Sequence, residues 1–284
     1  MPIPAQYLPA AYSLTAMGIW GGSDFLGGVG ARRANVFLFT AIVHLSGVVL
    51  MGTLALATHA PFLSRSSVLW CIAAGSVGGI SLALFYRALA SGKMGLTAPV
   101  AAVLGAGIPT VVTAFTAGFP GYRQGLGFIV AGIGVWLISR EDESGRPEGL
   151  GWAVIAGVGF AVFYLCIKQA GNGSPLWIVF CARVMSLSVT SLFVVFAGHV
   201  GTNFRAIERR ILALAVVTGG FDIIGSALFV RAAQTGRLDS AVVLSSLYPA
   251  VTVLLARFFL HEHFSRSKTV GMLAALAAVP LVAG

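Results

Sequence analysis

The chain has 284 residues, of which 57% are hydrophobic and only 10% are charged, and its mean hydropathy is +0.92. Because a soluble domain carries about 25% charged residues, this composition excludes an ordinary soluble fold. The formal charge of +9 would suggest nucleic acid in a soluble protein, but most of the 18 Lys and Arg fall in short connections between apolar runs. There they anchor helix ends at lipid headgroups, so no nucleic-acid partner is expected.

Apolar segments follow one another along the whole chain, and several exceed the roughly 20 residues that a helix needs to cross about 30 Å of hydrocarbon. They cover residues 8–28, 36–58, 67–90, 95–117, 124–139, 150–168, 175–198, 209–233, 239–260 and 269–284. The most polar connection, residues 140–148, separates one half, 1–140, from the other, 150–284. The sequence therefore predicts an all-α integral membrane protein with ten transmembrane helices in a lipid bilayer.

Small residues spaced four apart let helices approach closely in lipid. The pairs that predict such contacts are Gly18/Gly22, Gly75/Gly79 and Gly121/Gly125.

The two halves repeat each other. A shift of 144 residues places Ala83–Ala88 on Ala227–Ala232 and Gly75 on Gly219, and a shift of 139 places His44 on Arg183. Five helices per repeat is an odd number, so the second copy enters the membrane from the opposite side. Inverted repeats are a recurring transporter architecture, in which rocking of the halves exposes a midplane site to alternate sides. The sequence thus favours a secondary transporter.

Two stretches resemble the EamA family of the drug/metabolite transporter superfamily. One is Trp20-Gly-Gly-Ser-Asp24-Phe25, and the other is Leu247-Tyr-Pro249-Ala-Val-Thr followed by Leu260-His-Glu262. The first half departs from the family at Gly118, which stands where Glu262 stands in the second.

The resemblance implies a ten-helix fold and a metabolite exporter, with amino acids as possible substrates. A proton gradient or an exchanged solute would supply the energy. It also implies a bacterial-type inner membrane with cytoplasmic termini. Charge counting disagrees, because the connections after odd-numbered helices hold most of the Lys and Arg and would place the termini outside.

Ionisable residues inside predicted spans are costly, so each needs a partner or a function. The candidates are Asp24, His44, Arg183 and Asp222. Trp20 lies one helical turn before Asp24, so together they offer an aromatic face and a carboxylate to an amine-bearing substrate. Arg183 suits a substrate carboxylate. A purely structural role remains open for each.

Asp222 matches Gly78 in the first repeat, so its carboxylate is not part of the shared framework. Burial disfavours the charged carboxylate and a nearby cation such as Arg183 favours it, so the proton could alternate. We expect Asp222→Asn to keep the fold and abolish proton coupling, with Asp24 as the next candidate. Arg237, in a connection, is the expected neutral control.

Prolines in apolar runs remove a backbone donor and can act as hinges or merely improve packing. Pro99 and Pro249 are the candidates at a substrate site, and Tyr86, Tyr164 and Tyr248 could offer hydroxyls or only anchor their helices. We expect these residues around a cavity between the halves, lined by helices one, three, four, six, eight and nine.

No catalytic motif, P-loop or cofactor signature is present, so neither an enzyme nor a cofactor is expected. His261-Glu262-His263 lacks the spacing of a metal site. The alternatives are an intramembrane enzyme acting on a lipid-linked substrate, a channel, or a noncatalytic partner of another membrane protein.

Overall fold

The computed structural model describes residues 4–91, 94–139, 149–196, 208–261 and 265–283. Within these ranges the chain is helical and has no strand. A 3-10 turn, η1 (Ala5–Tyr7), precedes the first helix. The first half holds α1 (Leu8–Ala31), α2 (Val36–Ala57), α3 (Arg65–Ser91), α4 (Met94–Ala117) and α5 (Tyr122–Ser139). The second half holds α6 (Leu150–Gln169), α7 (Pro175–Phe196), α8 (Arg209–Thr235), α9 (Leu238–Ser245), α10 (Tyr248–Leu260) and α11 (Arg266–Ala283).

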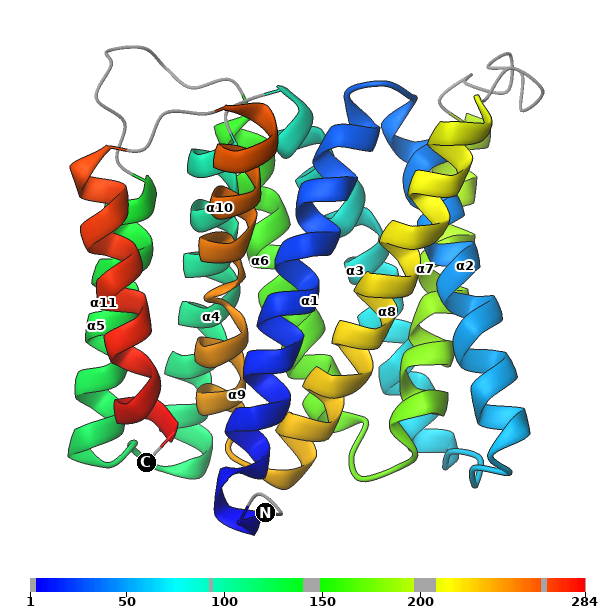
Figure 1. Ribbon diagram of the computed structural model, residues 1–284. Coiled ribbons are helices and arrows are strands. Elements are labelled where there is room, and N and C mark those ends of the chain that lie inside the picture. Colours follow the sequence, from blue (N-terminus) through cyan, green and yellow to red (C-terminus); the bar gives the residue numbers. More distant parts are fainter. Residues whose placement is uncertain (1–3, 92–93, 140–148, 197–207, 262–264, 284) are drawn as a thin grey trace.

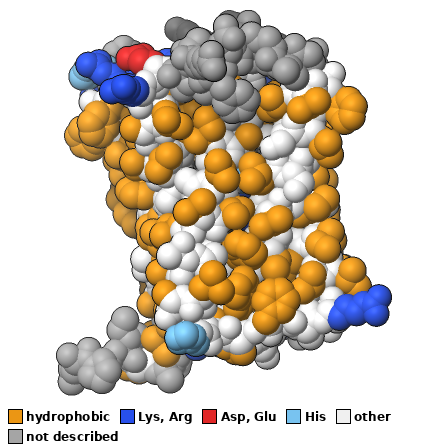
Figure 2. Space-filling model, turned by 90° about the vertical axis from the view of Figure 1, so that its right-hand side faces the viewer, with side chains coloured by type: hydrophobic (Ala, Val, Ile, Leu, Met, Phe, Trp, Pro, Cys, Tyr) orange, Lys and Arg blue, Asp and Glu red, His pale blue; other side chains and the backbone are white. Residues whose placement is uncertain are grey.

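The surface of the bundle suits a lipid environment. Within the described residues, 7 helical segments are long and apolar enough to cross a membrane, with α9 and α10 counted together as Leu238–Leu260. Figure 2 shows hydrophobic side chains over the middle of one face and Lys and Arg at its two ends. Large apolar side chains such as Val49 and Leu56 on α2 and Leu192 on α7 are exposed. The protein is therefore a multi-pass membrane protein.

The helices run side by side, and the first and last described residues lie at the same end of the bundle (Figure 1). At one edge α5 packs on α11, and at the other α2 packs on α7. Between these edges α1 packs on α8, α3 packs on α6 and α7, and α4 packs on α6. The centre of the bundle is thus built where the first half meets the second.

Glycine allows the closest of these contacts, though not at every predicted pair. A Cβ at Gly75 would collide with the carbonyl oxygen of Ala182 in α7, and one at Gly79 would lie 2.8 Å from the backbone of Ser186. This pair confirms the prediction of close packing. The prediction is wrong for Gly18, Gly121 and Gly125, which face nothing within 4 Å.

Each predicted apolar segment is helical over the residues that the structure describes, but the segment predicted over 239–260 is interrupted. A two-residue turn, Ser246 and Leu247, separates α9 from α10. Pro249 lies in the first turn of α10 and has no N–H to donate to the end of α9, so the helix is free to break there. In contrast α4, its counterpart in the first half, stays continuous through Pro99 and Pro109.

Candidate functional site

A cavity of about 50 Å³ lies at mid-height of the bundle, where helices of both halves meet. Its walls come from α1, α3, α6, α7, α8 and α10. Six of the residues singled out from the sequence line it: Trp20, Asp24, Tyr164, Arg183, Asp222 and Tyr248. The cavity was predicted, but its helices only in part, because α7 contributes Arg183 whereas no described residue of α4 lines the wall. This volume exceeds the roughly 10–15 Å³ needed for one water and is far below a drug-sized pocket.

Arg183 lies at the centre of a polar network that joins three helices. Its Nη2 forms an ion pair with Asp222 and donates to the hydroxyl of Ser226 at 3.1 Å. Its Nη1 lies 3.0 Å from Nδ1 of His44 on α2. A guanidinium has only donors, so this nitrogen of His44 must accept and carries no proton. Both terminal nitrogens of Arg183 are therefore already engaged by the protein.

Asp24 lines the same cavity from α1, but within the described part of the chain its side chain has no partner like those of Arg183. Its side chain is buried, with the residue only 6% exposed, and among the described residues it has neither a hydrogen bond nor an ion pair. Burying an unpaired polar group costs free energy, so such groups usually meet a ligand, water or ion. The hydroxyl of Tyr248 is likewise buried without a partner among the described residues.

Aromatic rings cover much of the remaining wall. The ring centroids of the lining residues Trp20 and Tyr164 lie 6.1 Å apart. Both rings pack on Phe229, with centroid distances of 5.6 Å from Trp20 and 4.8 Å from Tyr164. The indole N–H of Trp20 donates to the carbonyl oxygen of Asp222 at 3.1 Å, which fixes the ring against α8. The carboxylates of the cavity are thus surrounded by ordered aromatic surface.

The other sequence candidates lie behind or beside this wall. His44 is fully buried and reaches the cavity only through Arg183. Tyr86 is fully buried against Gly27 and Phe39 and does not line the cavity. Pro99 lies inside α4, away from the wall, and Pro249 follows the lining residue Tyr248. Glu262 of the predicted family motif lies outside the described residues, as does His263 of the stretch weighed as a metal site.

Sequence reasoning missed Ser226 and the rings of Phe85, Phe160 and Phe163, which also line the cavity. Ser226 lies one helical turn after Asp222, so the four-residue spacing in the sequence could have predicted its position on the same face of the helix. The phenylalanines carry no such signal, because apolar rings are common on every helix in lipid.

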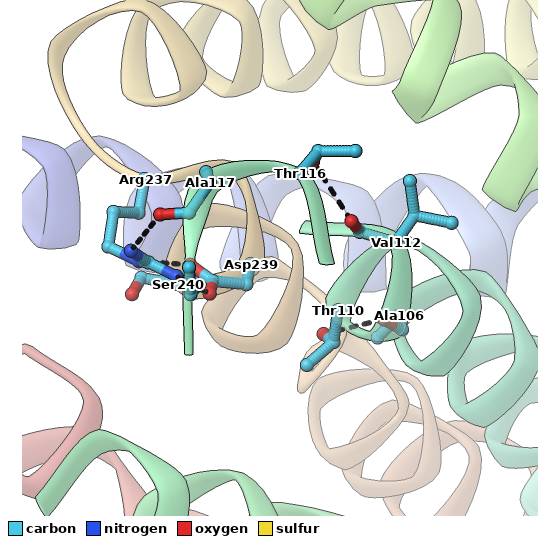
Figure 3. A network of polar contacts seen from close by, with 9 residues as sticks. Ala106, Thr110, Val112, Thr116, Ala117, Arg237, Asp239 and Ser240 are labelled. Carbon is cyan, nitrogen blue, oxygen red and sulfur yellow. Dashed lines mark hydrogen bonds and ion pairs between the residues drawn. The ribbon is translucent and has the colours of Figure 1, made fainter. Parts of the chain in front are cut away.

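A second polar network lies near the end of the bundle that holds the termini, and Figure 3 shows its members. Arg237 donates to both carboxylate oxygens of the fully buried Asp239, at 2.7 Å to Oδ2 and 3.1 Å to Oδ1, and to the carbonyl oxygen of Gly118 at 2.8 Å. Hydrogen bonding to Asp239 raises the pKa of Arg237 above its usual value. Because these bonds tie the start of α9 to the end of α4, Arg237 does not suit the neutral control expected from the sequence.

The second half of the chain is similar to a known protein family. The model of the EamA-like transporter family matches residues 147–284. An uncharacterized transporter of Archaeoglobus fulgidus is 24% identical over 154 residues, which are 54% of this chain. The match spans about half, 53%, of that relative.

An uncharacterized protein of Methanocaldococcus jannaschii is 28% identical over 136 residues, which are 46% of this chain and 95% of that protein. One solved crystal structure aligns with 96% of this chain and 95% of its own, with a TM-score of 0.69 and 16% identity. At that identity the likeness concerns the fold alone.

Proposed function

We propose that the whole chain is a secondary active transporter, because residues 147–284 match the model of the EamA-like transporter family. It would move small metabolites across the membrane by alternating access. Amino acids are the first class to test, with export as the direction, as the resemblance implies. The observation that carries the proposal is a cavity at mid-height that is walled by both halves of an apolar bundle and lined by three charged residues, Asp24, Arg183 and Asp222.

The packing pattern supports an inverted repeat of two five-helix units. The contact of α1 with α8 is matched by that of α3 with α6, and α2 and α5 pack on their own counterparts α7 and α11. A two-fold rotation produces this exchange of partners. His44 and Arg183, which are equivalent by the 139-residue shift, touch each other, as only residues near such an axis can.

The relative from Methanocaldococcus jannaschii supports the same division. Its alignment covers 95% of that protein but only 46% of this chain, so that protein is about as long as one half. A single five-helix unit of this kind is what duplication would start from. The proposed units are residues 1–140 and 150–284.

Coupling to a proton or to an exchanged solute needs a group whose charge can change during the cycle. Asp24 and Asp222 are the candidate carboxylates, since both line the cavity. Asp222 is held in an ion pair with Arg183, whereas Asp24 has no such partner among the described residues, so Asp24 is the better candidate for a change of charge.

Counterflow in proteoliposomes tests the proposal. Liposomes with purified protein and loaded with an unlabelled amino acid or amine should take up the same labelled compound transiently, with saturation and trans-stimulation. Uptake that rises linearly with concentration would indicate a channel. Chemical conversion of the labelled compound, without exchange, would indicate an enzyme.

We propose that the termini face the cytoplasm of a bacterial-type inner membrane, as the family resemblance implies. The opposite end of the bundle carries Arg32, Arg209, Arg210 and Arg266, which argues for the reverse. A reporter fused to the C-terminus and active only outside the cytoplasm decides between the two, and its activity would overturn this orientation.

A further inference from the structure

The charges around the central cavity do not balance. Asp222 and Arg183 neutralise each other, and His44 accepts a hydrogen bond from Arg183 and so carries no proton at Nδ1. Asp24 is left as the one lining carboxylate without a cationic partner among the described residues. In its ionised form it gives the cavity a net negative charge, which attracts a cation.

The walls suit an organic cation better than a metal ion. No group of three or more metal-binding side chains exists among the described residues. Trp20, Tyr164 and Tyr248 instead place aromatic rings on the wall that holds Asp24, and aromatic faces attract ammonium groups. The partnerless hydroxyl of Tyr248 can accept an ammonium N–H.

We infer that the cavity binds small organic ammonium ions, with Asp24 as their counter-ion, and discriminates against amino acids that keep their carboxylate. The inference rests on the proposed transport function, and it replaces amino acids with amines as the substrate class of the same site. It differs from the sequence-based expectation, in which Arg183 receives a substrate carboxylate.

The state of Arg183 is the reason for this discrimination. Its terminal nitrogens are engaged by Asp222, Ser226 and His44. A substrate carboxylate would have to compete with Asp222 for the one positive charge of Arg183, so that two buried carboxylates would share a single cation. An amine without a carboxylate binds Asp24 and leaves this network intact.

Three compounds that share one branched hydrocarbon group test the inference on the purified full-length protein: isobutylamine has only the amine, isovaleric acid only the carboxylate, and valine has both. Binding is measured by calorimetry and by the shift of melting temperature, since a ligand of the folded state raises stability with occupancy. We expect isobutylamine to bind about tenfold or more tightly than valine, and isovaleric acid not to bind. The same series built on phenylalanine, with phenethylamine and 3-phenylpropionic acid, tests the aromatic walls.

Asp24→Asn should lose amine binding at an unchanged melting temperature without ligand, because Asn keeps the shape and removes only the charge. Glu208→Gln is the matched control, since it removes one exposed carboxylate at the end of the bundle. It should bind amines as the wild type does. If Asp24→Asn fails to fold, the compound series on the wild type still decides.

Valine binding as tightly as isobutylamine, no compound binding, or amine binding that survives Asp24→Asn would each overturn the inference. Its failure is separable from that of the proposed function. Counterflow of valine without amine binding would refute the substrate class and retain the transporter. Amine binding without counterflow would retain the site and refute the transporter.

Discussion

The two aspartates that line the cavity differ in their partners. Asp222 on α8 is held by Arg183, whereas Asp24 on α1 has no partner among the described residues. Both are buried to nearly the same extent, so burial does not distinguish them. The difference is that one charge is already neutralised by the protein. A structural role therefore suits Asp222, and an exchangeable partner suits Asp24.

The largest effect is expected from removing the charge of Asp222. Asp222→Asn leaves Arg183 as a buried cation without its counter-ion, which typically costs about 3–5 kcal/mol. This differs from the sequence-based expectation that the variant keeps its fold. We expect a strongly lowered melting temperature and poor yield in detergent, and recovery in the double variant Arg183→Met/Asp222→Leu. A normal melting temperature for Asp222→Asn would remove the structural role.

Arg237 and Asp239 form a second arginine–aspartate pair, in which the loss of the cation can be measured separately. Arg237→Gln leaves the buried Asp239 with its bond from the N–H of Ser240 but without the guanidinium. We expect a loss of about 1–3 kcal/mol, seen as a lower melting temperature. Arg65→Gln, an exposed arginine at the same end of the bundle, is the control and should have little effect. Equal melting temperatures for both variants would show that the Arg237 network contributes nothing measurable.

Trp20 links the helices that carry the two aspartates, α1 and α8. Its ring lines the cavity wall on α1 with Asp24, and its N–H donates to the backbone carbonyl of Asp222 on α8. Trp20→Phe keeps an aromatic face and loses that bond. The carbonyl oxygen still accepts from Ser226, so the expected cost is only about 1 kcal/mol. Amine affinity should fall more than stability, as measured by calorimetry beside thermal melting. A drop in stability with full affinity would limit Trp20 to packing.

The smallest effect on folding is expected at the break between α9 and α10. Pro249→Ala restores a backbone donor in the first turn of α10, where a proline costs little. We expect a nearly unchanged melting temperature but an altered exchange rate in proteoliposomes. Pro99→Ala, inside the continuous counterpart helix α4, is the control and should leave the rate unchanged. Parallel loss of yield and exchange in Pro249→Ala would indicate packing instead of a hinge.

The helices were predictable because lipid imposes long apolar segments, and their bounds differ from the prediction by a few residues. The break near Pro249 was foreseen only as a possible kink. A proline in an apolar segment does not by itself determine whether the helix breaks, since Pro99 and Pro109 leave α4 continuous.

The candidate site was predictable as a set of residues but not as a set of partners. Buried charges are rare in lipid, so Asp24, Arg183 and Asp222 stood out by type. Which carboxylate receives the guanidinium depends on the packing of α7 and α8 against α1, and no spacing in the sequence encodes it. The 139-residue shift pairs His44 with Arg183 in the sequence, but it does not predict that the two side chains touch.

Exchange of labelled isobutylamine in proteoliposomes, compared between the wild type and Asp24→Asn, shows whether Asp24 is the counter-ion of a transported amine. This role of Asp24 predicts saturable, trans-stimulated uptake for the wild type and none for the variant, at equal melting temperatures. Equal exchange by both proteins, or uptake by the wild type that neither saturates nor responds to internal amine, would contradict it.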